Sequence, residues 1–234
     1  MSAIHVVDLG ARPYGEILEL QRRLCRERVA GQRSEDLLLL VEHPPVITLG
    51  RSTRDTSLPL PRALLEQQGL EVFEIERGGD VTLHAPGQLV GYPIFDLKEH
   101  RQDLHWYLRQ IEEALISGLA EFRIPGDRNP GFTGVWTGGR KIASIGIHVK
   151  QWVTFHGFAL NVTTALDLFD LIVPCGIHGV TMTSIARETG RTDDLMSAAR
   201  ERIAVGFAGA FERTVTWSDE SILGPREPEP LSER

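Results

Sequence analysis

Strand-like and helix-like segments follow one another in an irregular order along this chain, and this order constrains the fold more than any other sequence feature. Apolar residues recur at helical spacing in residues 14–29, 104–122 and 195–211. Short β-branched and apolar runs occupy 4–9, 36–42, 45–49, 70–76, 81–83 and 89–95, and three more lie between 134 and 162. Because strict β-α-β alternation is absent, we expect an α+β fold: a mixed sheet with flanking helices.

Local signals refine this expectation. Residues 4–9 are expected to form an edge strand, and 81–83 with 89–95 a hairpin around the turn at 85–87. A short helix is expected from Pro61 to Gly69, because proline suits the first turn of a helix. The segment 126–131 is rich in glycine and proline and is expected to form a loop.

Length and composition restrict the class of protein. At ~100–200 residues per domain, 234 residues allow one large domain, which we assign to 1–217. Residues 218–234 are acidic and contain proline, so we expect a disordered tail there. The longest strongly apolar run, 37–41, is far too short to span a membrane, and no signal peptide is visible. A net charge of −7 argues against nucleic-acid binding. Without a membrane-spanning run or a signal peptide, we expect a cytoplasmic protein.

The first segment with chemical potential is 77–88 (RGGDVTLHAPGQ). Paired glycines let a backbone approach a ligand closely, and their amides can bind a carbonyl or phosphate. Taken alone, two glycines after a strand more often mark a turn.

The second segment, 138–148, contains Lys141, one of only three lysines in the chain. In an extended strand Lys141, Ala143 and Ile145 share one face, and Ile142, Ser144 and Gly146 share the other. Lysine differs from arginine in that its amine can lose a proton, so Lys141 is a candidate proton carrier. The alternative is a lysine that protects an edge strand against aggregation.

The third segment is 172–179, in which Cys175 lies between proline and glycine. Such a constrained turn favours presentation of the thiol to a cavity, whereas Cys25 repeats the position of Leu18 on a helix and is expected in the core. Two cysteines are too few for a disulfide framework, and no His/Cys/Asp cluster has metal-ligand spacing. No metal or cofactor is therefore expected.

Five motifs in order resemble those of the lipoyl(octanoyl) transferase family, the octanoyltransferases of lipoate biosynthesis. They are 42–51 (EHPPVITLGR), 77–93 (RGGDVTLHAPGQLVGYP), 139–146 (GRKIASIG), 156–161 (HGFALN) and 174–177 (PCGI). Ala85 and Met182 depart from the family pattern, which usually has glycine and valine there, but neither change removes a reactive group. The resemblance spans about two thirds of the chain and implies the catalytic fold of biotin- and lipoate-protein ligases.

The resemblance also implies an activity and a set of residues. An octanoyl group would pass from octanoyl-acyl carrier protein to a lysine on a lipoyl domain of the 2-oxoacid dehydrogenases or the glycine cleavage H protein. Cys175 would be the nucleophile and Lys141 its partner. The substrate-binding residues would come from three stretches: Arg77, Gly78, Gly79, Asp80, Val81, Thr82, Leu83 and His84; Ser144, Ile145 and Gly146; Gly157, Phe158 and Ala159.

Three alternatives remain open at this point. An ATP-dependent lipoate or octanoate ligase of the same fold would leave the Pro-Cys-Gly turn unexplained. A non-catalytic module that binds lipoyl domains would have no need of both Cys175 and Lys141, and a cysteine hydrolase would use water as the acceptor. A Cys–His pair is the competing chemistry, with His84 as a substrate-positioning residue or an alternative proton acceptor.

Overall fold

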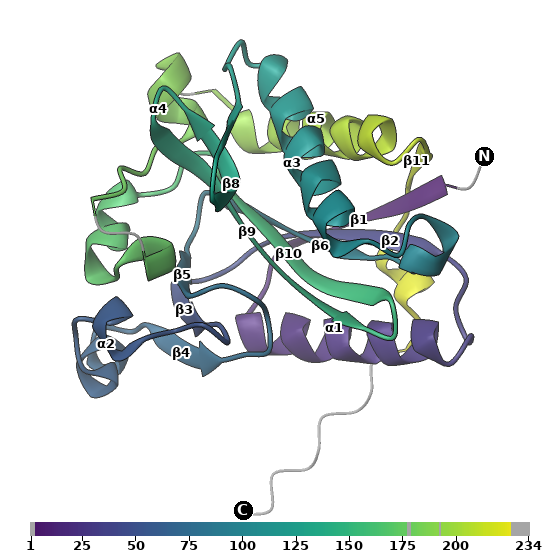
Figure 1. Ribbon diagram of the computed structural model, residues 1–234, viewed down its shortest axis with the longest axis horizontal. Helices are drawn as coiled ribbons and strands as arrows, with labels where there is room; N and C mark the ends of the chain where they lie inside the picture. The colour runs from purple at the N-terminus through teal and green to yellow at the C-terminus, as the bar shows by residue number, and fades with distance from the viewer. Residues whose placement is uncertain (1–2, 177–178, 192, 226–234) are drawn as a thin grey trace, which may run out of the picture.

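Two β-sheets of unequal size organise the computed structural model, which describes residues 3–176, 179–191 and 193–225 (Figure 1). The large sheet has the strand order β11-β1-β2-β6-β10-β9-β8-β7, and the small sheet β4-β3-β5. β11, β1 and β2 are parallel to one another, and the other pairs of the large sheet are antiparallel. The strands are β1 Ala3–Ala11, β2 Asp36–Glu42, β3 Val46–Leu49, β4 Glu71–Glu74, β5 Val81–His84, β6 Gln88–Ile94, β7 Asp127–Asn129, β8 Phe132–Thr137, β9 Arg140–Lys150, β10 Val153–Asn161 and β11 Thr214–Trp217. The expected α+β fold with a mixed sheet is confirmed.

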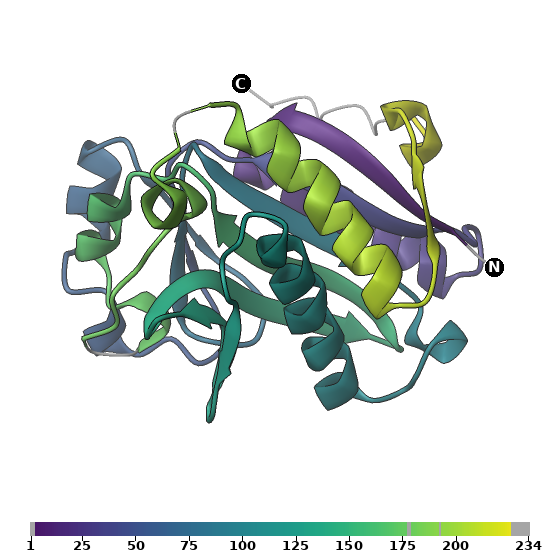
Figure 2. The same cartoon turned by 90° about the horizontal axis from the view of Figure 1, so that it is seen from above.

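Helices cover both faces of the large sheet. α3 and α5 lie on one face and α1 on the other (Figures 1 and 2). The helices are α1 Tyr14–Val29, α2 Arg62–Gln67, α3 Leu104–Ala120, α4 Ile185–Thr189 and α5 Leu195–Ala210. Short 3-10 helices are η1 Asp55–Ser57, η2 Leu97–Glu99, η3 Leu166–Leu171, η4 Pro174–Gly176 and η5 Glu220–Leu223. α3 is capped by Asp103, whose carboxylate accepts a hydrogen bond from the Trp106 amide.

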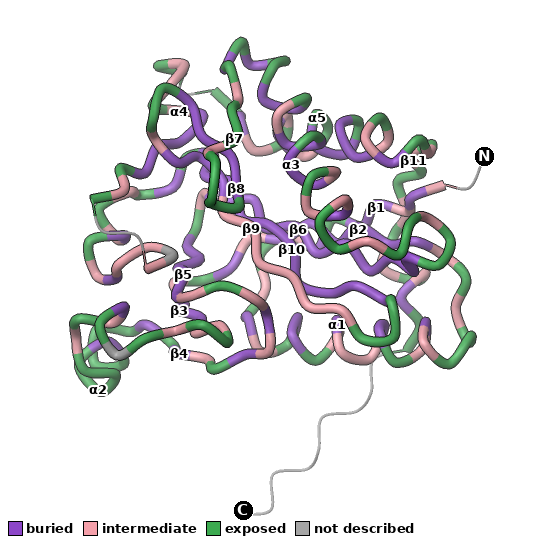
Figure 3. The backbone as a smooth tube through the Cα atoms, viewed as in Figure 1, coloured by how far each residue is buried: buried purple, intermediate pink, exposed green. Residues whose placement is uncertain are grey.

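The central strand β2 explains the apolar run seen in the sequence. Its side chains alternate between two cores: Leu38 and Leu40 pack under α3 and α5, whereas Leu37 and Leu39 pack against α1. Because both faces are covered, every residue from 36 to 41 is buried (Figure 3). The run is therefore a strand that is buried on both faces, a pattern typical of sheets with helices on both sides. Among the described residues no helix is long and apolar enough to cross a membrane.

Two local expectations about strands are wrong. β1 lies between β11 and β2, so the edge of the sheet is formed instead by β11, a short strand that follows α5. β5 and β6 are not paired as a hairpin: β5 pairs with β3 in the small sheet, and β6 pairs with β2 and β10 in the large one. The turn at residues 85–87 therefore carries the chain from one sheet to the other.

Two further segments differ from expectation. Residues 127–129 pair with β8 through the tight turn at Pro130 and Gly131, where a loop was expected. Residues 218–225 are tied to the domain, although the composition predicted a disordered tail from 218: Leu223 is buried against α1 and β1, and Glu220 forms an ion pair with Arg12 at 2.8 Å. Residues 226–234 lie outside the described part of the chain.

A smaller core forms beside the large sheet. It contains Ile47 of β3, Leu65 of α2 and Leu83 of β5, with Phe169 of η3 packed against them. The small sheet, α2, η1, η3 and η4 thus form a lobe at the end of the large sheet (Figure 1). The boundary between this lobe and strands β6, β9 and β10 is where the candidate site lies.

Candidate active site

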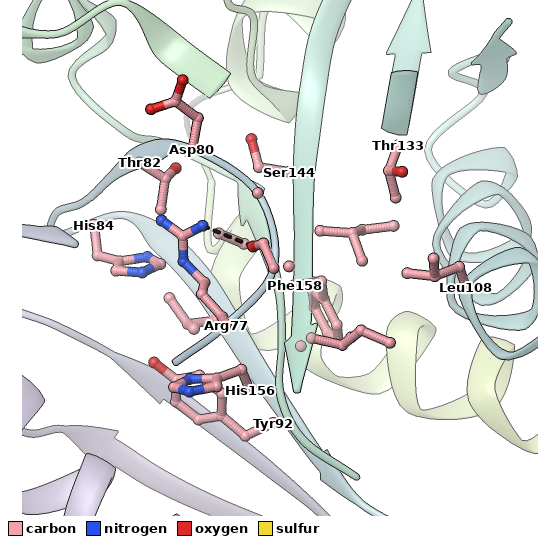
Figure 4. A pocket seen from close by; sticks show the side chains of 18 of the residues that line it. Arg77, Asp80, Thr82, His84, Tyr92, Leu108, Thr133, Ser144, His156 and Phe158 are labelled. Carbon is pink, nitrogen blue, oxygen red and sulfur yellow. Dashed lines mark hydrogen bonds between the residues drawn. The ribbon is translucent and has the colours of Figure 1, made fainter. Parts of the chain in front are cut away.

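A cavity of about 280 Å³ lies where the two sheets meet (Figure 4). Its walls come from the 77–84 segment, strands β6, β9 and β10, helix α3 and the β7–β8 turn. The lining residues are Tyr14, Arg77, Gly78, Gly79, Asp80, Thr82, His84, Val90, Tyr92, Leu108, Gly131, Phe132, Thr133, Lys141, Ser144, Ile145, Gly146, Ile147, His156, Gly157, Phe158 and Ala159. Arg77, His84, Tyr92 and His156 make one side polar, whereas Leu108 lies on the opposite side (Figure 4). The cavity can thus hold an apolar chain next to a polar reacting group.

The substrate-binding residues expected from sequence divide by strand geometry. Along β5, Thr82 and His84 line the cavity, whereas Val81 and Leu83 are fully buried in the core of the small lobe. Period-two alternation requires this division, so Val81 and Leu83 face the core instead of the site. The other expected substrate-binding residues all line the cavity.

The Arg77–Gly79 segment is fixed by hydrogen bonds of its own. The Arg77 guanidinium donates to the Thr48 carbonyl at 2.9 Å, to the Thr48 hydroxyl at 3.0 Å and to the Gly78 carbonyl at 3.0 Å. The Gly78 amide donates to the Ile147 carbonyl of β9 at 2.8 Å. A Cβ on Gly146 would lie 2.9 Å from the Gly78 carbonyl oxygen, so this close approach requires glycine. Arg77 therefore acts here as a buried structural cation.

Lys141 is almost completely buried at the start of β9, with 1% of its surface exposed. Its Nζ lies 4.8 Å from the centre of the Trp136 ring, a cation–π contact. Its amide donates to the Thr181 carbonyl at 2.8 Å, and its carbonyl accepts from the Thr183 amide at 2.9 Å. A lysine held in this way is not an edge-strand guard, because its amine is enclosed at the cavity.

A β-bulge explains why Lys141 and Ser144 line the same cavity. Val135 pairs with Ala143 while the next residue, Trp136, pairs with Lys141, so β9 carries one extra residue there. In a regular strand Lys141 and Ser144 would face opposite sides. The bulge brings both to the cavity wall.

The turn that contains Cys175 lies beside the same cavity. η4 packs on β5 and η1, and the Val173 amide donates to the Ser57 carbonyl at 3.0 Å. A Cβ on Gly176 would lie 2.3 Å from a carboxylate oxygen of Asp80, so the backbone next to Cys175 touches a cavity residue. Asp80 is held by the Ser57 hydroxyl at 2.8 Å.

The second cysteine has a different setting. Cys25 is buried in the core between α1 and the large sheet, as expected from its helical spacing. Burial raises the pKa of the Cys25 thiol to about 11, which disfavours its thiolate form.

Histidines gather at the polar side of the cavity. His84 Nδ1 lies 2.8 Å from Gln88 Oε1, and His43 bridges the Arg12 carbonyl at 2.8 Å and the Tyr92 hydroxyl at 2.9 Å. Burial lowers the pKa of His84 to about 3 and that of His43 to about 4. Both rings are therefore neutral at physiological pH, and neither can serve as an acid there. His178, which is three residues from Cys175 in the sequence, lies outside the described residues.

His156 has a strained position in β10. Its backbone has a φ of 57°, and its amide donates to the Gln21 side chain at 2.9 Å. Its Nε2 lies 3.9 Å from a carboxylate oxygen of Glu76, which is held by two hydrogen bonds from Arg22. Burial lowers the pKa of His156 as well. Among the described residues, no cluster of three His, Cys, Asp or Glu side chains could hold a metal ion.

Several cavity residues escaped the sequence analysis. Leu108 of α3 and Phe132 of β8 are partly exposed apolar side chains that reach the cavity from distant parts of the chain. Tyr14 and Tyr92 reach it from α1 and β6. In the sequence, only the position of Phe132 directly after Pro130 and Gly131 offered a local signal, because the other contacts depend on how the helices pack on the sheet.

Comparison with known proteins places this architecture in a family. Residues 13–208 match the family described as the lipoyl protein ligase A/B catalytic domain. An octanoyltransferase of Gloeobacter violaceus is 52% identical over 172 residues, 74% of this chain and 75% of that protein. An octanoyltransferase of Rubrobacter xylanophilus is 50% identical over 200 residues, 85% and 89% of the two chains.

Solved structures agree at the level of the fold. A lipoate-protein ligase A bound with ATP superposes with a TM-score of 0.72 at 16% identity, over 95% of this chain and 93% of that one. A bipartite lipoate protein ligase of Thermoplasma acidophilum gives a TM-score of 0.73 at 13% identity, over 95% and 91%. With the fold shared by lipoate ligases and half of the sequence shared with octanoyltransferases, the chain belongs to the octanoyltransferases of the lipoyl protein ligase A/B family.

Proposed function

We propose that this octanoyltransferase takes an octanoyl group from octanoyl-acyl carrier protein onto Cys175 and passes it to a lysine ε-amine on lipoyl domains. The acceptors would be the lipoyl domains of 2-oxoacid dehydrogenases and the glycine cleavage H protein, and the reaction would take place in the cytoplasm. Family membership supports the transfer of octanoyl in protein lipoylation. The thioester intermediate, the donor and the roles of Cys175 and Lys141 are our proposal.

One observation carries the proposal. The amine of Lys141 is enclosed at a cavity, and the Pro174–Gly176 turn packs against Asp80 on the wall of that cavity. Burying an amine opposes folding unless other interactions compensate for it, and here the enclosed amine and the residue that the cysteine-bearing turn touches, Asp80, line one cavity. This arrangement suits a nucleophile and a proton carrier that act on the same substrate.

The first half-reaction begins with the Cys175 thiolate. An ammonium on Lys141 favours that thiolate by charge. The sulfur attacks the thioester carbonyl of the donor, the bond between the carbonyl carbon and the carrier sulfur breaks, and the carrier leaves as a thiolate that takes up a proton. Lys141 can supply this proton, which leaves its amine neutral.

The second half-reaction needs that neutral amine. An acceptor lysine with a pKa of ~10.4 is only about 0.1% neutral near pH 7.5, so its ammonium must first lose one proton to the solvent to gain a lone pair. The neutral amine then attacks, and a base must remove a second proton from the nitrogen as the amide forms. Lys141 can accept this proton when the acceptor nitrogen bonds to the acyl carbon and the bond to Cys175 breaks. The enzyme then returns to its starting state, a thiolate beside an ammonium.

The apolar side of the cavity suits the acyl chain. Phe158 and Ile145 pack against the core under α3, and Leu108 adds an apolar surface from that helix. Each buried methylene contributes about 0.8 kcal/mol, so this side favours an octanoyl group over short acyl groups. The polar side near His84 is left for the reacting end.

Intact-protein mass spectrometry tests the proposal. After mixing with octanoyl-acyl carrier protein, the protein should gain the mass of one octanoyl group, and adding a lipoyl domain should discharge it. Cys175→Ser should abolish the gain, whereas Cys25→Ser, the matched control in the core, should keep it.

Two results would contradict the proposal. One is a persistent octanoyl adduct on Cys175→Ser. The other is modification of the lipoyl domain only with free octanoate and ATP, which would assign the chain to ligase chemistry.

A further inference from the structure

Two buried side-chain amides, Gln88 and Asn161, form a relay of hydrogen bonds behind the cavity wall. The Asn161 side-chain nitrogen donates to the Thr183 carbonyl at 3.0 Å, and the Gln88 side-chain nitrogen donates to Asn161 Oδ1 at 2.9 Å and to the Leu83 carbonyl at 3.2 Å. Gln88 Oε1 lies 2.8 Å from Nδ1 of His84. Gln88 and Asn161 are each 1% exposed, so water cannot replace these contacts.

Two backbone carbonyls fix the direction of every hydrogen bond in this relay. A carbonyl oxygen only accepts, so Asn161 must turn its NH₂ toward Thr183 and Gln88 must turn its NH₂ toward Leu83. Gln88 Oε1 is then an obligatory acceptor, and His84 Nδ1 must carry the proton. Rotating either amide by 180° would place two oxygens against each other.

The environment of His84 keeps the ring neutral. The side chain is 6% exposed, stacks on Tyr14 at 5.8 Å and faces the ring of His43 at 5.8 Å. Burial disfavours the charged form of this ring, and the positive charge of Arg77 also opposes a cation there. With Nδ1 protonated and the ring neutral, Nε2 keeps its lone pair.

We propose that Gln88 and Asn161 are positioning residues that lock His84 in its Nδ1–H tautomer, so that Nε2 offers a permanent acceptor to an N–H group of the substrate. His84 lines the cavity, and Nε2 has no hydrogen-bond partner within the described part of the chain. The N–H group is either the acceptor lysine amine or an amide of the donor's pantetheine arm. This inference rests on the proposed function, but the tautomer itself does not depend on activity.

The arrangement also connects His84 with Lys141. The relay ends on the Thr183 carbonyl, and the Thr183 amide donates to the Lys141 carbonyl at 2.9 Å. The acceptor nitrogen of His84 and the strand that bears Lys141 are therefore positioned by one set of hydrogen bonds. His84 would hold an N–H group without taking its proton, while Lys141 takes the proton.

The tautomer can be measured on the unaltered protein. Nitrogen-15 NMR of the imidazole rings distinguishes a protonated ring nitrogen from one with a lone pair, and His84→Gln identifies the His84 signals. We expect a protonated Nδ1 and an unprotonated Nε2 at every pH from 6 to 8. An Nε2–H tautomer, or a doubly protonated ring at pH 7, would overturn the inference whatever the activity.

Variants then test the relay. Gln88→Leu removes the acceptor and should shift His84 toward the Nε2–H tautomer, with kcat/KM lowered about three- to tenfold. Thr164→Val is the matched control, because it removes a hydrogen bond to Gly87 at the same turn and leaves the Gln88 contact intact. It should change neither the tautomer nor kcat/KM. An unchanged His84 tautomer in Gln88→Leu would exclude the relay.

The half-reactions distinguish the two sources of the N–H group. His84→Phe keeps an aromatic ring and removes Nε2, so it should slow one step about tenfold or more. Slower formation of the octanoyl adduct would assign the contact to the donor, and slower discharge to the lipoyl domain would assign it to the acceptor lysine. Unchanged rates in both steps would exclude the substrate contact even if the tautomer is as expected.

Discussion

At the residue scale, the strongest constraint is the enclosure of Lys141 between Trp136, Gly134 and the backbone of 181–183. Its Cε lies 3.0 Å from where a Gly134 Cβ would be, and its Nζ lies over the Trp136 ring. Substitutions at this position therefore report on the amine itself only if folding is preserved. Lys141→Met keeps nearly the same shape without charge and is the natural reference.

The two roles proposed for Lys141 can be separated by charge and by proton transfer. Lys141→Arg keeps the positive charge and should still form octanoyl-Cys175, but guanidinium cannot accept a proton, so discharge should slow by ~10²–10⁴. Lys141→Met should impair both half-reactions. Rapid-quench mass spectrometry measures both steps, and thermal unfolding checks that each variant is folded. Discharge of the Arg variant at the parent rate would show that another group takes the proton.

Arg140, next to Lys141, forms an ion pair with Glu188 that the sequence alone does not reveal. A basic side chain next to Lys141 could be interpreted as a docking contact, but the Arg140 guanidinium forms two hydrogen bonds with Glu188, at 2.9 and 2.8 Å. Glu188 also accepts from the Thr183 hydroxyl. The pair therefore fastens α4 to the strand that carries Lys141, and the charge is already paired within the protein.

At the scale of elements, glycines set the approach of α3 and α5 over the large sheet. A Cβ on Gly206 of α5 would lie 2.2 Å from the Ala114 carbonyl oxygen of α3, and one on Gly118 of α3 would lie 2.5 Å from Ile203. The two helices therefore meet backbone to backbone. This contact also holds α3, and with it Leu108, above the cavity.

Two alanine substitutions on α5 should have opposite effects. Gly206→Ala forces the helices apart and should lower the free energy of unfolding by about 1–3 kcal/mol. Gly209→Ala has nothing within 4 Å of its Cβ and should raise that free energy by up to about 1 kcal/mol, since alanine favours helix. Urea unfolding measures both. Equal effects of the two substitutions would mean that the helices are not packed at Gly206.

At the scale of the whole molecule, buried neutral histidines should make stability depend on pH. His43 and His84 have folded-state pKa values of about 4 and 3, below the ~6.5 of an unfolded chain. The unfolded state therefore binds more protons below pH 6.5, and the free energy of unfolding should fall as pH falls, by roughly 2 kcal/mol for each ring between pH 7 and 5. This loss of unfolding free energy is absent well above pH 6.5, where the rings are neutral in both the folded and the unfolded state.

Urea unfolding at several pH values between 5 and 7 tests this dependence. This pH range lies above the pKa of ~4.3 of glutamates in an unfolded chain, so histidines account for most of the change in unfolding free energy within it. His43→Gln should reduce the slope of stability against pH even if it lowers stability overall. A slope that is unchanged in this variant, or stability that rises toward pH 5, would contradict the neutral state of the ring.

The proposed donor, an acyl carrier protein, would dock on the surface of the whole molecule. The chain carries a net charge of −7, so an acidic carrier needs a local basic surface. The arginines of α1 do not provide this surface in full, because Arg22 pairs with Glu76, Arg23 with Glu27 and Arg28 with Asp36. Arg51 and Arg54 are exposed, and the Arg51 amide donates to the Arg77 carbonyl beside the cavity.

Reversing these two charges should weaken donor binding. The double variant Arg51→Glu/Arg54→Glu should raise the KM for octanoyl-acyl carrier protein about threefold or more at low salt, with little change at high salt. Arg26→Glu, an exposed arginine on α1, is the matched control and should leave KM unchanged. Equal KM values for both variants at low salt would place the docking surface elsewhere.

The sequence by itself determined the fold class and the helices 14–29, 104–120 and 195–210 to within two residues, and it singled out the segments around Lys141 and Cys175 as candidates for the chemistry. These follow from local periodicity and from short motifs, which are properties of neighbouring residues. The tertiary structure alone decided that β5 and β6 enter different sheets, that a bulge turns Lys141 and Ser144 to one cavity, and that Leu108 and Tyr14 reach it. Strand partners, bulges and helix approach depend on residues far apart in the chain, and no local pattern encodes them.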